Sequence, residues 1–259
     1  MNEQKSGNPG FNPDYLNFAY SGRVGTRRGQ YCIEQLRYMR VCHARIREDQ
    51  GKYAREKKAD ITCGKGCSYC CFLYIGASLQ ECEAIAYHLA HNEALLSKFI
   101  AAYPAWRQKV SSGGDRFLEC QTMFNRMIAE GMGNNDSFDM ALFSHNKQQI
   151  PCPFLESGLC SIYDTRPANC AGLFVTRPPE YCRPGSPRPP RFNLTSIDDV
   201  MYDTTFYYRK LARPATIYMP VAVYRILTEG YSYLSGFAGI EDIGRDFLAG
   251  LESSGQQKA

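Results

Sequence analysis

The stretch CGKGCSYCC, residues 63 to 71, places four cysteines within nine positions. The chain has 12 cysteines among 259 residues, so composition alone would put roughly 0.4 of them into a stretch of that length. Thiolates are ligands of zinc and of iron–sulfur clusters, and such centres need several sulfurs that converge from different directions. The stretch therefore predicts metal chemistry.

A second group of cysteines lies in PCPFLESGLCSIYDTRPANC, residues 151 to 170, and one more follows in a proline-rich segment. Loops with glycine and proline can wrap around a metal so that several sulfurs point inward. The candidate ligands in such loops are Cys63, Cys67, Cys70, Cys71, Cys152, Cys160, Cys170 and Cys182. The other four cysteines lie on apolar faces of predicted helices and are expected to be buried as small hydrophobic residues; they are Cys32, Cys42, Cys82 and Cys120.

Three interpretations of the loop cysteines compete: a metal site, a disulfide framework and coincidental core residues. The first residues, MNEQKSGNPGFNPDY, carry no secretory signal, so we expect a cytoplasmic protein, where metal binding is favoured over disulfides. More than four thiols without a well-placed histidine favour an iron–sulfur cluster, 4Fe-4S first, over zinc, because four ligands satisfy zinc. Zinc is the alternative cofactor.

Two residues within the motifs need separate predictions. Adjacent side chains diverge in extended and helical backbone, so Cys70 and Cys71 are expected to point apart. One of them would then be a ligand and the other a bystander, or each would serve a different metal. Arg166 would either neutralise an anionic thiolate cluster or pair with Asp164 or a loop carbonyl.

The two motifs together resemble the CxxCxxCC cysteine-cluster proteins (YkgJ-like), a family described as zinc- or iron-chelating domains. The resemblance covers roughly residues 63 to 182 and includes Tyr163, Arg166 and Pro167, which match the family's IY..RP..C stretch. It implies that all the candidate cysteines up to Cys170 are ligands and that Tyr163 and Arg166 lie beside the cofactor. The family includes flagellin lysine N-methylases. The resemblance thus implies a methyl-transferring or redox iron–sulfur enzyme or, as the alternative, a non-catalytic zinc- or iron-binding module that binds another protein.

The elements that position these motifs are predicted to be helices and one hairpin. Apolar residues at three- and four-residue steps predict a helix from Arg28 to about Lys58, which leads into the first motif. Ser78 to Glu81 has the spacing of a capping box and starts a second helix, with an apolar face that extends to Leu96. Further helices are predicted at about 105–111, 116–130, 197–212, 220–230 and 240–251. Residues 156–158 predict a hairpin turn, and the proline-rich segment 176–191 predicts an extended loop.

The sequence as a whole predicts a mainly α protein with a single compact domain at residues 26–252, a flexible arm at 1–25 and a disordered tail at 253–259. No run approaches the roughly 18 apolar residues of a membrane span, so we expect no membrane partner. A net charge of +4 is too mild to predict nucleic-acid binding. The expected partners are a metal ion or cluster and a protein substrate or partner.

Overall fold

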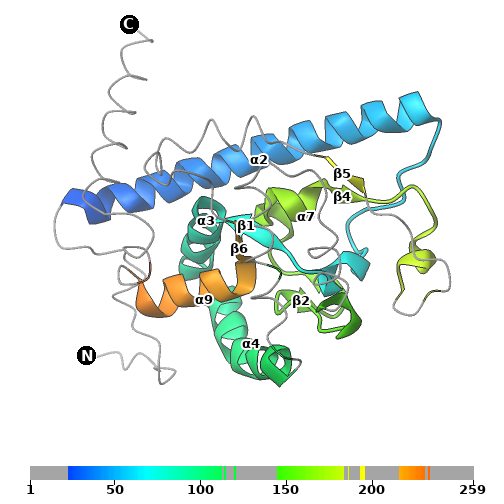
Figure 1. The fold of residues 1–259 in the computed structure, drawn as a ribbon. Helices are drawn as coiled ribbons and strands as arrows, with labels where there is room; N and C mark the ends of the chain where they lie inside the picture. Colours follow the sequence, from blue (N-terminus) through cyan, green and yellow to red (C-terminus); the bar gives the residue numbers. More distant parts are fainter. Residues whose placement is uncertain are drawn as a thin grey trace, which may run out of the picture.

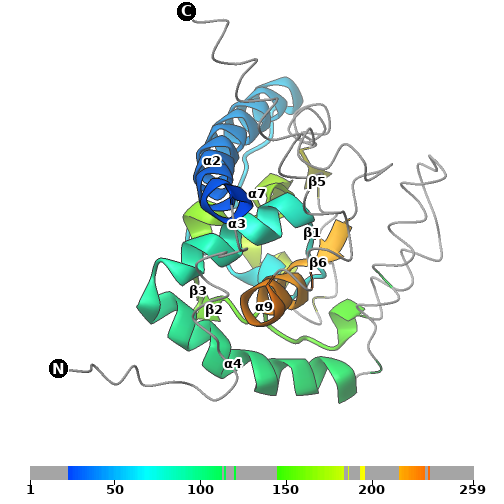
Figure 2. The same ribbon diagram turned by 90° about the vertical axis from the view of Figure 1, so that its left-hand side faces the viewer.

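The structure, a computed structural model, describes residues 23–112, 145–183, 193–195 and 216–230, together with positions 114, 120, 186 and 233. Within these residues the fold is mainly α, as predicted, and the strands form three short antiparallel pairs. The long helix α2 runs along one side, and α3, α9 and α4 follow beneath it (Figure 1). Turned by 90°, the same arrangement shows α9 between α3 and α4 (Figure 2).

Helix α2 (Arg23–Lys57) confirms the first predicted helix, although it begins at Arg23 rather than Arg28. Its apolar stripe is buried: Cys32 and Met39 join the main core, whereas Cys42 and Ile46 pack against the segment around Ala168. Arg55 and Lys57 lie in its last turn, where cations interact favourably with the helix dipole. The chain then leaves the helix at Lys58, whose φ is 49°, and enters the first cysteine motif.

Helix α3 (Leu79–Ala90) begins with the predicted capping box. The amide of Glu81 donates to Ser78 Oγ at 3.2 Å, and the Ser78 amide donates to Glu81 Oε2 at 2.9 Å. Glu81 also accepts a bond at 2.8 Å from the amide of Ala168, the first residue of α7 (Ala168–Gly172). One buried carboxylate therefore satisfies amides at the start of two helices.

Helix α4 (Glu93–Ser112) corrects two predictions. The apolar face does not continue in one helix to Leu96, because α3 ends at Ala90 and Asn92 accepts a bond from the Leu95 amide, which starts a new helix. The next helix begins at Glu93 rather than near 105 and passes through Pro104. A proline removes one helical hydrogen bond, and the buried aromatic residues of α4 offset that loss; they are Phe99, Tyr103 and Trp106.

The strand β6 (Thr216–Tyr218) pairs antiparallel with β1 (Gly76–Ser78), so that Gly76 lies opposite Tyr218. It leads into α9 (Met219–Glu229), which has Pro220 in its first turn and ends at Gly230 with φ 52°, as predicted. Stacked rings bind α9 and its neighbours into the core: Tyr224 lies 3.7 Å from Tyr103 between ring centroids, and Tyr218 lies 4.8 Å from Tyr74.

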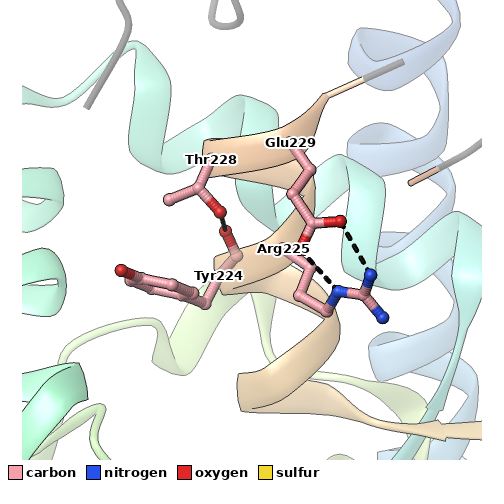
Figure 3. A network of polar contacts seen from close by, with 4 residues as sticks. All are labelled: Tyr224, Arg225, Thr228 and Glu229. Carbon is pink, nitrogen blue, oxygen red and sulfur yellow. Dashed lines mark hydrogen bonds and ion pairs between the residues drawn. The ribbon is translucent and has the colours of Figure 1, made fainter. Parts of the chain in front are cut away.

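The last two turns of α9 carry its own polar contacts (Figure 3). Arg225 donates from Nε and Nη2 to the two carboxylate oxygens of Glu229 at 2.6 and 2.7 Å, and Thr228 Oγ1 donates to the carbonyl of Tyr224 at 2.9 Å. Exposed pairs of this kind contribute up to about 1 kcal/mol. They support the helix end and lie apart from the cysteine motifs.

The remaining strands are two residues long. The strands β2 (Leu155–Glu156) and β3 (Leu159–Cys160) form the predicted hairpin, and β4 (Leu173–Phe174) pairs with β5 (Asn193–Leu194). Gly172 is required at the start of the second pair, because a Cβ there would lie 2.6 Å from the carbonyl oxygen of Thr195. The 3-10 turns are η1 (Tyr69–Phe72), η2 (Tyr163–Thr165) and η3 (Pro179–Cys182).

The turn η3 corrects the prediction that the proline-rich segment is extended throughout. Pro178 and Pro179 stand where this turn begins, and the fixed φ of proline suits a first turn. The predicted helices at 116–130, apart from Cys120, and at 197–212 and 240–251 lie outside the described residues, as do residues 1–22 of the arm and the tail 253–259. None of the described helices combines the length and the apolar character that crossing a bilayer requires.

Replacing Glu81 by alanine is expected to lower the free energy of unfolding by about 2–4 kcal/mol, because the amides of Ser78 and Ala168 both lose a buried acceptor. Glu81→Gln keeps an acceptor oxygen and should lose less. Denaturant unfolding measures both, with the exposed Glu56→Ala in α2 as the matched control. An unfolding midpoint for Glu81→Ala equal to that of the control would show that the carboxylate does not join the two helices.

Candidate metal centre

The structure brings all the predicted ligand cysteines into one neighbourhood. Five of them line a cavity of about 170 Å³: Cys63, Cys67, Cys70, Cys170 and Cys182. The other three, Cys71, Cys152 and Cys160, lie close enough that their charges raise one another's pKa or that of Cys170. Residues from both motifs and from the proline-rich segment therefore meet at one place.

Electrostatic contacts divide the cysteines into two overlapping groups. Cys182 interacts with Cys63, Cys67 and Cys70, which together form the group at the cavity. Cys71 interacts with Cys152 and Cys160, which form the group at the hairpin. Cys70 and Cys170 connect the two groups, because both line the cavity and both interact with the hairpin cysteines.

The first motif folds back on itself through successive turns. The Cys67 amide donates to the Gly64 carbonyl at 3.1 Å, and the Cys71 amide donates to the Ser68 carbonyl at 3.0 Å. Gly66 has φ 96°, a conformation that residues with a side chain rarely adopt. These turns keep the four cysteines of the motif close to one another.

The hairpin positions two sulfurs at its base. Ser157 and Gly158 have φ values of 48° and 80°, as a two-residue turn with positive φ at both positions requires. The amide two residues beyond each cysteine donates to its sulfur: Phe154 to Cys152 and Ile162 to Cys160. Hydrogen bonds of this kind stabilise a thiolate.

The hairpin is also tied to the first motif. The Cys152 amide donates to the carbonyl of Cys71 at 2.7 Å, and the Tyr74 amide donates to Asn146 Oδ1 at 3.3 Å. The first bond joins the backbones of the two motifs directly, and the second joins the segments next to them.

Helix α7 carries Cys170 and is held from two sides. Gln50 Nε2 of α2 donates to the carbonyls of Ala171 and Gly172, each at 3.3 Å. Asn169 Nδ2 donates to the Gly76 carbonyl of β1 at 2.8 Å. With the Glu81 bond at its first residue, this short helix has its position set by three neighbouring elements.

Three further hydrogen bonds support the edge of the cavity that Cys63 and Cys182 form. The Val175 amide donates to Cys63 Sγ at 3.3 Å, and the Thr62 amide donates back to the Val175 carbonyl at 3.2 Å. Arg183, which follows Cys182, donates from Nε to the hydroxyl of Tyr69 at 3.0 Å. The proline-rich segment is thereby attached to the first motif.

Burial governs the protonation of these thiols. It raises the pKa of Cys152 to about 12 and that of Cys182 to about 11, and it raises the pKa of Cys63, Cys160 and Cys170 as well. In each case the charges of neighbouring cysteines raise the pKa further. Without a cation, most of these sulfurs are therefore neutral thiols at pH 7.

Cys70 and Cys71 do not point apart as expected. Cys71 donates a side-chain hydrogen bond to Cys70, which lowers the pKa of Cys70 to about 7 and raises that of Cys71. Both residues lie in the 3-10 turn η1, and both interact with the hairpin cysteines Cys152 and Cys160. The expectation was wrong because backbone direction sets only the Cβ positions, whereas the sulfurs follow the χ1 angles.

Arg166 and Tyr163 both line the cavity. The Arg166 guanidinium lies 4.1 Å from the centre of the Tyr163 ring, and its charge acts to lower the pKa of Cys63, Cys70, Cys160 and Cys170. Its Nε is buried without a hydrogen-bond partner. Among the ion pairs of the described residues there is none between Arg166 and Asp164, whereas neutralisation of a thiolate cluster by Arg166 stays a prediction.

Sequence reasoning missed the polar residues that α2 contributes. His43, Arg47 and Gln50 lie at i, i+4 and i+7 on one helix face and line the cavity. His43 Nε2 donates to the carbonyl of Arg166 at 2.8 Å, and burial lowers the pKa of His43. The sequence did contain a signal for them, because these polar residues recur at helical spacing beside the apolar stripe of the same helix.

The division of the cysteines into two classes agrees with their burial. Cys32, Cys82 and Cys120 are fully buried and Cys42 is nearly so, whereas the predicted ligands are all partly exposed. In their present positions, no three or more Cys, His, Asp or Glu side chains in the described part of the chain form a group that could hold a metal ion.

Comparison of the chain with models of protein families, with curated proteins and with solved structures gives no match. The resemblance of its motifs to the cysteine-cluster family stays a prediction.

Iodoacetamide is expected to alkylate Cys70 before the other thiols of the metal-free protein at pH 7, because a thiol with a pKa of about 7 is roughly half ionised there. Cys71→Ala removes the hydrogen-bond donor and should slow this alkylation several-fold, whereas Cys32→Ala should leave it unchanged. Mass spectrometry of timed samples measures the rate at each site. An unchanged rate in Cys71→Ala would mean that Cys71 does not control the ionisation of Cys70.

Proposed function

We propose that this protein binds a metal cofactor through its loop cysteines, that the cofactor is a cysteine-ligated iron–sulfur cluster, and that the adjoining cavity receives a substrate. The observation that carries the proposal is the gathering of eight partly buried thiols from three separate segments, among which neighbouring cysteines raise the pKa of Cys71, Cys152 and Cys170. Thiols collected in this way favour a soft cation that neutralises them together.

The ligand set supports iron–sulfur chemistry over zinc. Eight thiols exceed the four that satisfy one zinc ion. The nearest histidine, His43, already donates from Nε2 to the carbonyl of Arg166. An all-thiolate set with a positive charge beside it suits a cluster whose sulfurs carry negative charge.

A specific observation favours zinc as the second candidate. Cys71, Cys152, Cys160 and Cys170 form a group of four at the hairpin, and two of their sulfurs accept hydrogen bonds from backbone amides. Four thiolates around a hairpin would make a closed structural zinc site. The protein would then be a binding module that folds around its metal.

Both candidates require the thiols to turn. Since no group of three is yet arranged to hold an ion among the described residues, we expect χ1 rotations that bring the sulfurs to a common centre. The backbone contacts that join the motifs need not change, because the turns and the hairpin already bring the sulfurs into one neighbourhood.

The cavity favours an enzyme over a closed structural site. Its volume of about 170 Å³ exceeds by an order of magnitude the roughly 10–15 Å³ that one water or ion occupies. Transfer of a methyl or similar group is the reaction that the family resemblance suggests, with a small molecule or a protein side chain as substrate. The cluster would supply electron transfer or Lewis-acid chemistry, and the chain's own residues would position the substrate.

Protein purified without oxygen after expression with ample iron is expected to be brown and to contain iron and acid-labile sulfide in stoichiometric amounts. Visible absorption, iron analysis and sulfide analysis measure this outcome. Colourless protein that carries only zinc would contradict the cluster and support the structural zinc module.

Serine replacements should separate ligands from bystanders. Cys67→Ser and Cys160→Ser are expected to lose metal, because a hydroxyl is a poor ligand for a soft metal. Cys70→Ser and Cys71→Ser should also lose it, since both residues interact with the hairpin cysteines.

The matched controls are Cys32→Ser and Cys120→Ser, in which buried cysteines outside the motifs are changed. They should keep their metal and lose on the order of 1 kcal/mol of stability. Metal analysis of the purified variants tests the division, and full metal retention in both Cys67→Ser and Cys160→Ser would overturn it.

A further inference from the structure

The cavity beside the thiols has a second, cationic side. The residues of α2 that line it are His43, Arg47 and Gln50, which share one face of the helix. Arg166 lines it as well, with its guanidinium on the ring of Tyr163. Two guanidinium groups and five cysteines therefore border the same space.

The two arginines face the space without acidic partners. No aspartate or glutamate is among the described residues that line the cavity. Neither Arg47 nor Arg166 belongs to an ion pair formed within the described residues, and Arg166 Nε is buried without a hydrogen-bond partner. A buried guanidinium nitrogen without a partner loses its hydration without compensation, so an anion that reaches it would be favoured.

The two arginines stand in different positions relative to the thiols. The charge of Arg166 acts on Cys63, Cys70, Cys160 and Cys170, so it serves the thiolates. Arg47 is exposed although it lines the cavity, which places it at the opening, and its charge acts on His43. Neutralising the thiolates accounts for the position of Arg166 but not for its Nε, which has no hydrogen-bond partner, and it leaves Arg47 available.

His43 connects the two arginines. Its Nε2 donates to the backbone carbonyl of Arg166, and the charges of both arginines act on its ring. Because His43 and Arg47 are one helical turn apart on α2, the same helix face fixes the backbone of one arginine and carries the other. Both arginines on the cationic side of the cavity are therefore positioned by α2.

We propose that this cavity binds the oxyanion group, a carboxylate or a phosphate, of a small-molecule co-substrate, with Arg47 and Arg166 as its binding residues. The inference rests on the proposed metal function, because it places the co-substrate next to the thiol-bound metal. Guanidinium groups match two-oxygen anions through paired hydrogen bonds, and Gln50 and Tyr163 border the same space. The reactive part of the co-substrate would then extend from the arginines toward the cysteines.

The test is a calorimetric titration of the full chain with malonate and with inorganic phosphate, and with malonamide as the neutral control. Both metal-loaded and metal-free samples are used, and the metal content of each is measured. We expect at least one anion to bind, malonamide not to bind, and Arg47→Met to weaken anion binding by about tenfold or more. The stronger of the two anions identifies the oxyanion class.

Arg45→Met is the matched control, because Arg45 is exposed on the same helix and does not line the cavity. It should keep wild-type anion affinity. Arg166→Lys, which keeps the charge but loses the paired hydrogen bonds, should weaken binding while the protein retains its metal. In the metal-loaded protein, a bound anion should also shift the visible absorption of the metal centre.

Two results would overturn the anion site: no binding of either anion, or equal weakening in Arg45→Met and Arg47→Met, which would indicate only the general positive charge of α2. Either result with full metal content leaves the proposed metal function standing. Absence of metal from every preparation would instead overturn the proposed function, and the metal-free titration would still decide whether the anion binds at the arginines.

Discussion

The carboxylate of Glu81 is the contact on which the rest of the structure depends. It is buried and accepts bonds from the amide and hydroxyl of Ser78 and from the amide of Ala168. Burial raises the pKa of Glu81, and these hydrogen bonds oppose that rise. Through them the start of α3, in the main core, sets the start of α7, which carries Cys170. The position of the second motif is thus set by a contact with a helix of the main hydrophobic core.

Helix α2 contacts the hydrophobic core with one face and the cavity with another. Its apolar stripe packs into both hydrophobic clusters, while His43, Arg47 and Gln50 line the cavity. Gln50 holds the end of α7 and His43 holds the carbonyl of Arg166. A long, straight element that is anchored by its apolar face can present polar groups at fixed positions. This explains why a helix outside both cysteine motifs still shapes the proposed site.

Charge balance is the chemical constraint at this site. The sulfurs of Cys152 and Cys170 are disfavoured as anions by desolvation and by the charges of neighbouring cysteines, which raise the pKa of both thiols. Arg166 and the amides of Phe154 and Ile162 act in the opposite direction, because they stabilise negative sulfur. The proposed metal would add the positive charge that is needed to stabilise the remaining thiolates. Arg47, which stands at the opening, is the cation that this balance does not use.

By itself the sequence determined the features that depend on neighbouring residues. The capping box at Ser78, the hairpin turn at Ser157 and Gly158, the end of α9 at Gly230 and the two classes of cysteine all follow from local spacing and composition. Only the tertiary structure decided that Cys70 and Cys71 turn toward each other, that α4 continues through Pro104, and that Arg47 reaches the cavity. The sulfurs of Cys70 and Cys71 follow side-chain torsions that residue spacing does not set. The other two features depend on packing against segments far away in the chain, and such contacts leave no periodic signal in the sequence around the residue itself.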